Sequence, residues 1–208
     1  VIHMGAISDT TEANGDLLVE QNIDFTLGLW RWCVEREVRL IYASSAATYG
    51  DGSTGMDDRS ENLSDHQPLN LYGLSKHKFD LHARDHGMLG SIVGLKYFNV
   101  FGPRQDPSSP YSGVISIFAE RMLQGTAPTV AGDGLQSRDF VYVDDVVEAN
   151  MRALTKPGIA GQVYNIGSER SVSILELVRA LNEVMGAALD PVFGPVRPGD
   201  VRVSLADI

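Results

Sequence analysis

Apolar and polar positions in the first half of the chain follow a pattern that predicts strands and helices in alternation. Short apolar runs at residues 1–6, 39–43 and 91–97 predict buried strands, because strands covered on both faces read as continuous apolar runs. Apolar residues recur at helical spacing over residues 16–37, and residues 70–86 are predicted to form a second long helix. The order strand, helix, strand, helix, strand predicts an α/β fold that contains half of a doubly wound parallel sheet, with both faces covered.

The second half of the chain has a different pattern, in which short strands and helices are mixed. Residues 105–112 are rich in Pro and Ser and mark a boundary. After it the pattern predicts a helix at 114–123, strands at 129–131, 139–143 and 163–166, a helix that is capped by Asp144 and runs to Leu154, and a helix from Ser173 to Gly186. Ser173 with Glu176 three positions later is a capping-box signature.

Composition and charge narrow the class of protein. Of the 208 residues, 43% are hydrophobic and 21% are charged, which is ordinary for a soluble globular protein. The formal net charge of −10 argues against a nucleic-acid surface, although a local basic pocket could still bind a small phosphorylated ligand. The single cysteine, Cys33, excludes an internal disulfide and fits a reducing cytosol, so we expect a cytoplasmic protein. No apolar run approaches the roughly 20 residues that span a bilayer.

The strongest candidate chemistry is a tyrosine and a lysine four positions apart. If residues 70–86 are helical, Tyr72 and Lys76 project from the same face. The ammonium favours the phenolate, and a nearby opposite charge can lower a pKa by roughly 1–3 units, which would make Tyr72 a usable base near neutral pH. Ser45 follows a predicted strand, and its hydroxyl can reach the same substrate oxygen. In isolation, the pair could equally be an ordinary exposed helix pair, and Ser45 could merely satisfy backbone donors in a turn.

Two histidines superficially suggest a metal site. His82 and His86 are four positions apart, with Asp85 between them. No third ligand falls at a suggestive spacing in the sequence, so we expect a solvated helix face and no metal.

Further motifs occur in a fixed order along the chain. They are residues 3–6, Asn22, residues 44–50, Tyr72 with Lys76, and residues 96–104, 132–134, 137–146 and 197–202. With these motifs the chain resembles the extended short-chain dehydrogenase/reductase family, specifically its nucleotide-sugar epimerases, over nearly its whole length. The resemblance implies a transient oxidation, in which a tyrosine takes a hydroxyl proton while a hydride passes to the cofactor. The resulting ketone then presents its other face before the hydride returns. The implied cofactor is NAD, with NADP as the alternative.

The resemblance also implies roles for individual residues. Tyr72 would be the catalytic base, Lys76 would tune its pKa, and Ser45 would anchor a substrate hydroxyl. The residues implied at the cofactor are Ala6, Asn22, Ser44, Tyr72, Lys76 and Tyr97. The residues implied at the substrate are Ser45, Asn99, Val114, Arg138, Arg197 and Asp200.

Simpler interpretations of the second group stay open. Arg138 could bind a phosphate oxygen, or it could pair with a neighbouring carboxylate, Asp139 or Asp144. Arg197 and Asp200 could hold the ribose or base, or they could form only a polar turn.

The two halves of the chain point to different substrates. Residues 5–12 and 42–50 look most like ADP-glycero-manno-heptose 6-epimerases, whereas residues 104–107, 111–115 and 197–200 look most like UDP-hexose 4-epimerases. Because substrate contacts concentrate in the second half, we expect a UDP-hexose, with an ADP-heptose as the alternative. The family's dehydratases typically carry Asp-Glu after a threonine in the serine loop, to eliminate water. Residues 46–49 contain no acid, so a nucleotide-sugar dehydratase is disfavoured. A catalytically inactive binding protein is disfavoured, because Ser45, Tyr72 and Lys76 are all present.

One feature of the family is absent from the sequence. No Gly-rich phosphate loop precedes the first strand, so we interpret the chain as a fragment truncated at both ends, whose Rossmann-type sheet lacks its first strands. Residues 1–103 would be the C-terminal part of the dinucleotide-binding domain. Residues 104–208 would form a smaller, incomplete mixed α/β substrate region, interleaved with the sheet. We expect this polypeptide alone to bind dinucleotide poorly and to be inactive. By analogy with the family, we expect a homodimer through the helices at 16–37 and 70–86.

Overall fold

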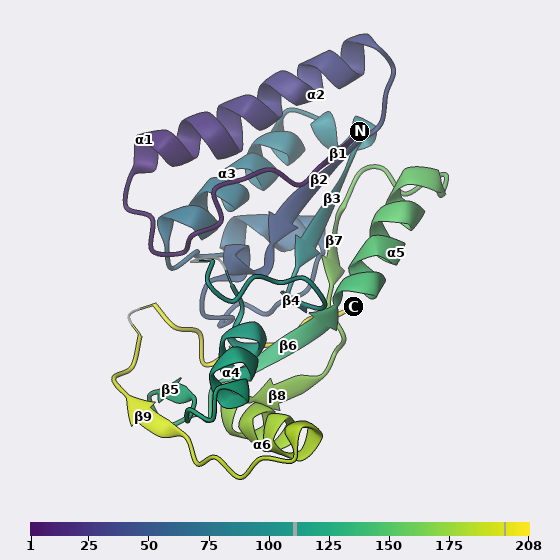
Figure 1. Cartoon of the computed structure of the whole chain (residues 1–208). Coiled ribbons are helices and arrows are strands. Elements are labelled where there is room, and N and C mark those ends of the chain that lie inside the picture. The colour runs from purple at the N-terminus through teal and green to yellow at the C-terminus, as the bar shows by residue number, and fades with distance from the viewer. Residues whose placement is uncertain (110–111, 198) are drawn as a thin grey trace.

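The sheet at the centre of the molecule is built from strands of both halves of the chain. The computed structural model describes residues 1–109, 112–197 and 199–208. The sheet contains β1 (Ile2–His3), β2 (Leu40–Ser45), β3 (Ile92–Tyr97) and β7 (Val163–Ile166), hydrogen-bonded in the order β1-β2-β3-β7. Every pairing along it is parallel. The predicted parallel sheet is therefore confirmed, and the figure shows helices on both of its faces (Figure 1).

Alternation along β2 divides the core into two layers. Successive side chains of a strand point to opposite faces. Leu40 packs with Cys33 and Phe79 under the helices on one face. Ile41 packs with Ala153 on the other face. The first layer lies under α2 (Phe25–Glu35) and α3 (Leu71–Asp85), and the second lies under α5 (Val143–Thr155).

The predicted helix at 16–37 is helical but not uniform. The structure has α1 (Gly15–Leu18), a π-helical segment (Val19–Asp24) and then α2, which ends at Glu35. The π-helical segment carries the buried Asn22, and such segments widen a helix by one residue per turn. The widening has no counterpart in the 3.6-residue pattern, so periodicity could not reveal it.

The helices of the second half begin and end close to the predicted places. α4 (Val114–Leu123) matches its prediction, and α6 (Ile174–Met185) has the predicted capping box between Ser173 and Glu176. Gly186 ends α6 in a left-handed conformation. The prediction that Asp144 caps α5 was wrong: the cap position is Tyr142, without a side-chain hydrogen bond, and Asp144 lies in the first turn.

A second group of short strands lies beyond the carboxyl ends of the first sheet. It contains β4 (Asn99–Phe101), β5 (Thr129–Ala131), β6 (Ser137–Tyr142), β8 (Ser171–Ser173), β9 (Val192–Gly194) and β10 (Val203–Ser204). β6 pairs with β10 and β4 in parallel and with β8 in antiparallel fashion, while β5 pairs with β9. Phe118, Val130 and Ile174 form the core between these strands and helices α4 and α6. No separate strand was predicted at β4, and its three residues become a strand by pairing with β6.

The two halves of the chain are interleaved, because β7 returns to the first sheet after the short strands begin. The motif residues Tyr111 and Pro198 lie outside the described residues. Within the described ranges, no helix combines the length and the apolar character needed to cross a bilayer.

Candidate active site

The carboxyl end of β2 carries two serines that point in opposite directions. Ser44 is buried, and its hydroxyl donates to Asp80 Oδ2 on α3 at 2.7 Å. Ser45 Oγ accepts from Ala47 N at 3.1 Å and so caps the short 3₁₀ helix Ala46–Tyr49. Strand alternation thus gives Ser44 a structural partner and leaves the Ser45 hydroxyl at the open edge of the sheet.

Helix α3 brings a phenol and an ammonium to the same edge. Asn70 caps the helix through its side chain, and Tyr72 and Lys76 follow one turn apart. Lys76 Nζ donates to Ala43 O of β2 at 2.8 Å. This bond and the bond from Ser44 to Asp80 hold α3 against the strand that carries Ser45.

The pKa of Tyr72 differs from the sequence expectation. Burial raises the pKa of Tyr72 above its ordinary value, and a hydrogen bond with Ser45 opposes this only in part. The pKa of Tyr72 is therefore raised in this structure, whereas its spacing from Lys76 predicted a lowered pKa; the role of Tyr72 as the base stays a prediction. Burial also lowers the pKa of Lys76 to about 8, so its ammonium is mostly charged at neutral pH.

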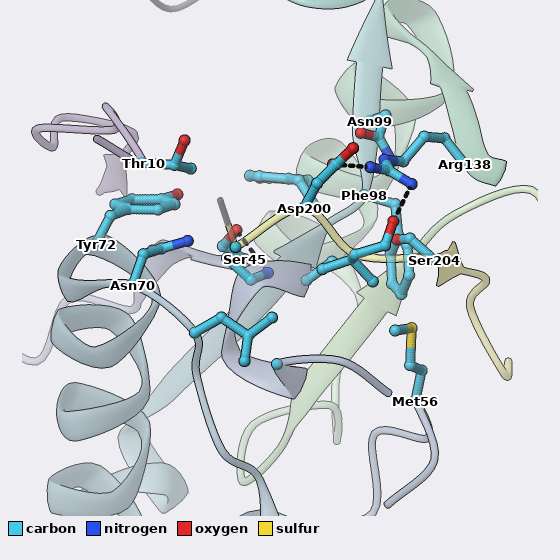
Figure 2. A pocket seen from close by; sticks show the side chains of 17 residues that line it. Thr10, Ser45, Met56, Asn70, Tyr72, Phe98, Asn99, Arg138, Asp200 and Ser204 are labelled. Atoms are coloured by element: carbon cyan, nitrogen blue, oxygen red, sulfur yellow. Dashed lines mark hydrogen bonds and ion pairs between the residues drawn. The ribbon is translucent and has the colours of Figure 1, made fainter. Parts of the chain in front are cut away.

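The hydroxyl and the phenol open into a cavity of about 270 Å³. Figure 2 shows Tyr72 and Ser45 on one side of it and Asn99, Arg138 and Asp200 on the other. Tyr97 also lines it. Its walls come from β2, β3, α3, β4, β6 and the segment before β10, so residues far apart in sequence meet here.

A second cavity of about 290 Å³ adjoins the first. Thr10, Asn99, Arg138 and Asp200 line both cavities, so the two form one elongated cleft. Val114 and Arg197 line the second cavity but not the first. The structure therefore brings every residue predicted at the substrate into this cleft. The hydroxyls of Ser45 and Tyr72 lie at one end, and the guanidinium groups of Arg138 and Arg197 lie toward the other.

Arg138 is held at the junction of the two cavities. Its guanidinium donates to the backbone oxygens of Ser137 and Val201, at 2.8 and 2.6 Å, and forms an ion pair with Asp200. The alternative pairing with Asp139 or Asp144 was wrong, because neither pairs with Arg138. A planar donor fork held this way presents several N–H groups to an anion.

Four residues predicted at the cofactor, Ala6, Asn22, Ser44 and Lys76, do not line these cavities, and Lys76 is bonded to Ala43 O as described above. Ser44 is bound to Asp80, as described above. Asn22 is buried, and its amide bonds to both backbone groups of Ile7 and to Ser75 Oγ. Asn22 therefore holds the loop after β1 against α3. Ala6 lies half-buried in that loop.

The first cavity also contains residues that sequence reasoning missed. They are Thr10, Met56, Leu69, Asn70 and Ser204. Asn70 had a signal, because Asn directly before a helix is a strong cap candidate. The other four lie on loops or a short strand, and only the tertiary fold brings them to the cleft.

Known proteins match this chain in both sequence and fold. The profile of the NAD dependent epimerase/dehydratase family matches residues 1–167. An ADP-L-glycero-D-manno-heptose-6-epimerase from Nitratidesulfovibrio vulgaris is 42% identical over 193 residues, which is 89% of this chain and 59% of that protein. The chain thus spans 59% of the length of the curated relatives it matches.

Solved structures are similar over the whole chain. A UDP-N-acetylglucosamine 4-epimerase from Methanobrevibacter ruminantium, in complex with UDP-N-acetylmuramic acid, has a TM-score of 0.90 and 35% identity, and the match covers 100% of this chain and 67% of that one. A UDP-glucose 4-epimerase from Thermus thermophilus, in complex with NAD, has a TM-score of 0.79 and 33% identity over 99% of this chain and 68% of that one.

Proposed function

The chain belongs to the NAD dependent epimerase/dehydratase family, and on that premise we propose that it supplies the catalytic and substrate-binding parts of a nucleotide-sugar epimerase. The observation that carries the proposal is the cleft, which has Ser45 and Tyr72 at one end and Arg138 at the junction. A nucleotide sugar has the same polarity, with a reacting hydroxyl at one end and a diphosphate next to it. The second cavity, with Arg197, leaves room for the nucleoside.

The reacting hydroxyl would lie between Ser45 Oγ and the phenol of Tyr72. Tyr72 would take its proton as the sugar carbon is oxidised and return a proton when the carbon is reduced from the other face. The raised pKa of Tyr72 favours the phenol, which is the form required for the return step. The forward step needs phenolate, and the positive charge of Lys76, one turn further along α3, would favour that form.

The residues present fit the ribose side of NAD. Lys76 carries three N–H donors and gives one to Ala43 O, so further donors remain for ribose hydroxyls at the carboxyl edge of β2. Open α/β sheets bind ligands at this edge. Lys76 and Tyr72 would hold the ribose, with Tyr97 nearby on β3. Bound NAD would supply reversible hydride acceptance, which the side chains themselves cannot provide.

Arg138 would hold the diphosphate. In the structure its guanidinium is paired with Asp200, whose carboxylate takes the place that a phosphate oxygen would take. Binding of substrate would then exchange Asp200 for phosphate and free the carboxylate for a ribose hydroxyl. Asn99 Nδ2 is already bonded to Asp139 O at 3.0 Å, so its amide has a fixed orientation at the same place.

We favour a UDP-hexose as the substrate and C4 as the reacting carbon. The motifs of the second half of the chain support this choice, as does the likeness to UDP-sugar 4-epimerases. The curated relative at 42% identity, an ADP-L-glycero-D-manno-heptose-6-epimerase, supports the alternative of an ADP-heptose.

We also propose a homodimer through α1, α2 and α3. Val19, in the π-helical segment between α1 and α2, is 46% exposed. On α2, Phe25 and Trp32 are 57% and 44% exposed, and on α3, Leu71 and Leu74 are 38% and 37% exposed. Light scattering on the protein expressed from its complete reading frame tests this, with a dimer expected and a monomer contradicting it. Phe25→Glu should shift the mass toward the monomer, whereas Val184→Glu, on the distant α6, should not.

The decisive experiment assays that same protein against UDP-glucose, UDP-galactose, their N-acetylated forms and an ADP-heptose. The expected result is interconversion of a UDP-hexose with its C4 epimer, and a reduction of about 10²–10⁴-fold in kcat for Tyr72→Phe. Turnover of the ADP-heptose alone would establish the alternative. An unchanged rate for Tyr72→Phe would show that another group is the base.

A further inference from the structure

The side-chain amide of Asn70 uses its oxygen in a hydrogen bond within the protein and leaves its nitrogen available. Its Oδ1 accepts from Gly73 N at 2.8 Å, which caps α3. Since the oxygen is fixed by the cap, the orientation of the whole amide group is fixed too. Nδ2 must therefore point away from the helix end.

The free end faces the reacting position. Asn70 lines the same cavity as Ser45 and Tyr72. Figure 2 shows its amide nitrogen directed toward Ser45, below the ring of Tyr72. Within the described ranges of the chain, Nδ2 has no acceptor: the hydrogen bond of this side chain is the cap. A donor beside the serine and tyrosine is thus left for whatever binds there.

We propose that Asn70 is a specificity-determining residue, whose Nδ2 donates a hydrogen bond to the sugar oxygen that neighbours the reacting hydroxyl. This inference rests on the proposed function. Because the amide nitrogen only donates, it selects an oxygen acceptor, either a hydroxyl or a carboxylate. A sugar with a C–H group at that position would leave the donor unpaired in the cavity, and sites built to bond an oxygen discriminate strongly against such analogues.

The cap and the donor can be separated by substitution. Asn70→Ser keeps a side-chain oxygen that caps the helix nearly as well as Asn, but it removes the N–H₂ group. Asn70→Asp also keeps the cap and replaces the donor with a carboxylate oxygen. Asn70→Ala removes both functions. A purely structural Asn70 would show a defect in Asn70→Ala and none in the other two.

The test uses the protein from its complete reading frame, with UDP-glucose, UDP-3-deoxyglucose and UDP-6-deoxyglucose as probes. For the wild type, we expect kcat/KM to be about 10–100-fold lower for one of the two deoxy analogues than for UDP-glucose. For Asn70→Ser, kcat/KM with UDP-glucose should fall by a similar factor, while the preference over that analogue disappears. The melting temperature of Asn70→Ser should stay within about 2 °C of the wild type.

Two results would overturn the inference alone. One is a wild type that turns over UDP-glucose but does not discriminate against either deoxy analogue. The other is an Asn70→Ser variant that keeps the full preference. A wild type that turns over no UDP-hexose would instead refute the proposed substrate, and the inference about Asn70 would fall with it.

Discussion

Asp80 Oδ2 accepts the hydroxyl of Ser44 at 2.7 Å, and this bond ties the middle of α3 to the end of β2. The other carboxylate oxygen accepts the phenol of Tyr42 at 2.9 Å, and Asp80 is fully buried. Burial raises the pKa of Asp80, while the charge of Lys96 and these hydrogen bonds act in the opposite direction. The position of Tyr72 relative to Ser45 therefore depends on a buried carboxylate one turn beyond Lys76.

Asp80→Ala should destabilise the fold strongly. It leaves two hydroxyls without an acceptor and removes the carboxylate whose charge acts most strongly on the buried Lys96, so we expect a loss of about 3–5 kcal/mol in the free energy of unfolding. Urea denaturation measures this. Asp85→Ala, which removes an exposed partner of Arg84 at the end of the same helix, is the control and should cost at most about 1 kcal/mol. Equal effects of the two substitutions would contradict the role of Asp80.

Gly73→Ala should displace α3 from the serine turn. A Cβ at Gly73 would lie 2.6 Å from Ala47 O, which is backbone and cannot move aside without moving the turn. Because that turn follows Ser45, we expect kcat to fall by at least about tenfold. Gly28→Ala in α2 is the matched control, because a Cβ there meets nothing within 4 Å. The control should gain up to about 1 kcal/mol from helix propensity. Full activity of Gly73→Ala would refute the predicted clash.

Acid should destabilise the protein through two buried histidines. Burial lowers the pKa of His66 and of His77 to about 4, and the positive charge of Lys96 adds to the effect. Between the ordinary pKa of 6.5 and this value, the unfolded chain binds protons that the folded protein does not, so stability falls as the pH falls. From about pH 7 to about pH 5, the two histidines together should cost on the order of 3 kcal/mol.

Urea denaturation at both pH values measures this loss. The double variant His66→Gln and His77→Gln should lose less stability than the wild type over the same interval. A wild type whose free energy of unfolding is the same at both pH values would contradict the prediction.

Arg138→Lys should weaken substrate binding more than it slows chemistry. A lysine has three donors on one nitrogen, whereas the guanidinium has five in a planar fork, so a lysine cannot keep the bonds to Ser137 O and Val201 O and also present two parallel donors to an anion. We expect KM for the nucleotide sugar to rise about tenfold or more, with a smaller change in kcat. Steady-state kinetics measure both. Arg202→Lys, in an exposed ion pair with Asp133, should leave KM unchanged. A kcat defect at unchanged KM would place Arg138 elsewhere in the mechanism.

The sequence predicted correctly those helices whose ends are marked by capping residues close by in the chain. The capping box of Ser173 and Glu176 and the left-handed Gly186 fix both ends of α6, and both were visible in the sequence. The strand β4 was not, because three residues have no period of their own and become a strand only through β6. The cap of α5 was misplaced because Asp144 is a good cap residue by type, while the backbone turns into the helix two positions earlier.

In the candidate site, too, features that belong to one helix could be predicted, and features that depend on tertiary packing could not. The spacing of Tyr72 and Lys76 is a property of one helix, and the sequence could reveal it. The pairing of Arg138 with Asp200 joins positions 62 residues apart and depends on how β6 and the segment before β10 meet. The raised pKa of Tyr72 depends on burial, which a pattern of residue types cannot measure.

The return of β7 to the central sheet also sets an order of events during synthesis. A ribosome releases β1, β2 and β3 before the whole of α4, β5, β6 and α5, and only then releases β7. In that interval the edge of β3 carries unpaired backbone groups, and Leu95 lacks the strand that later covers its flank. A nascent chain that pauses there can pair with the same edge of another copy. Slow translation between Tyr97 and Ile166 should therefore favour aggregation, whereas a pause after Ile166 should be harmless.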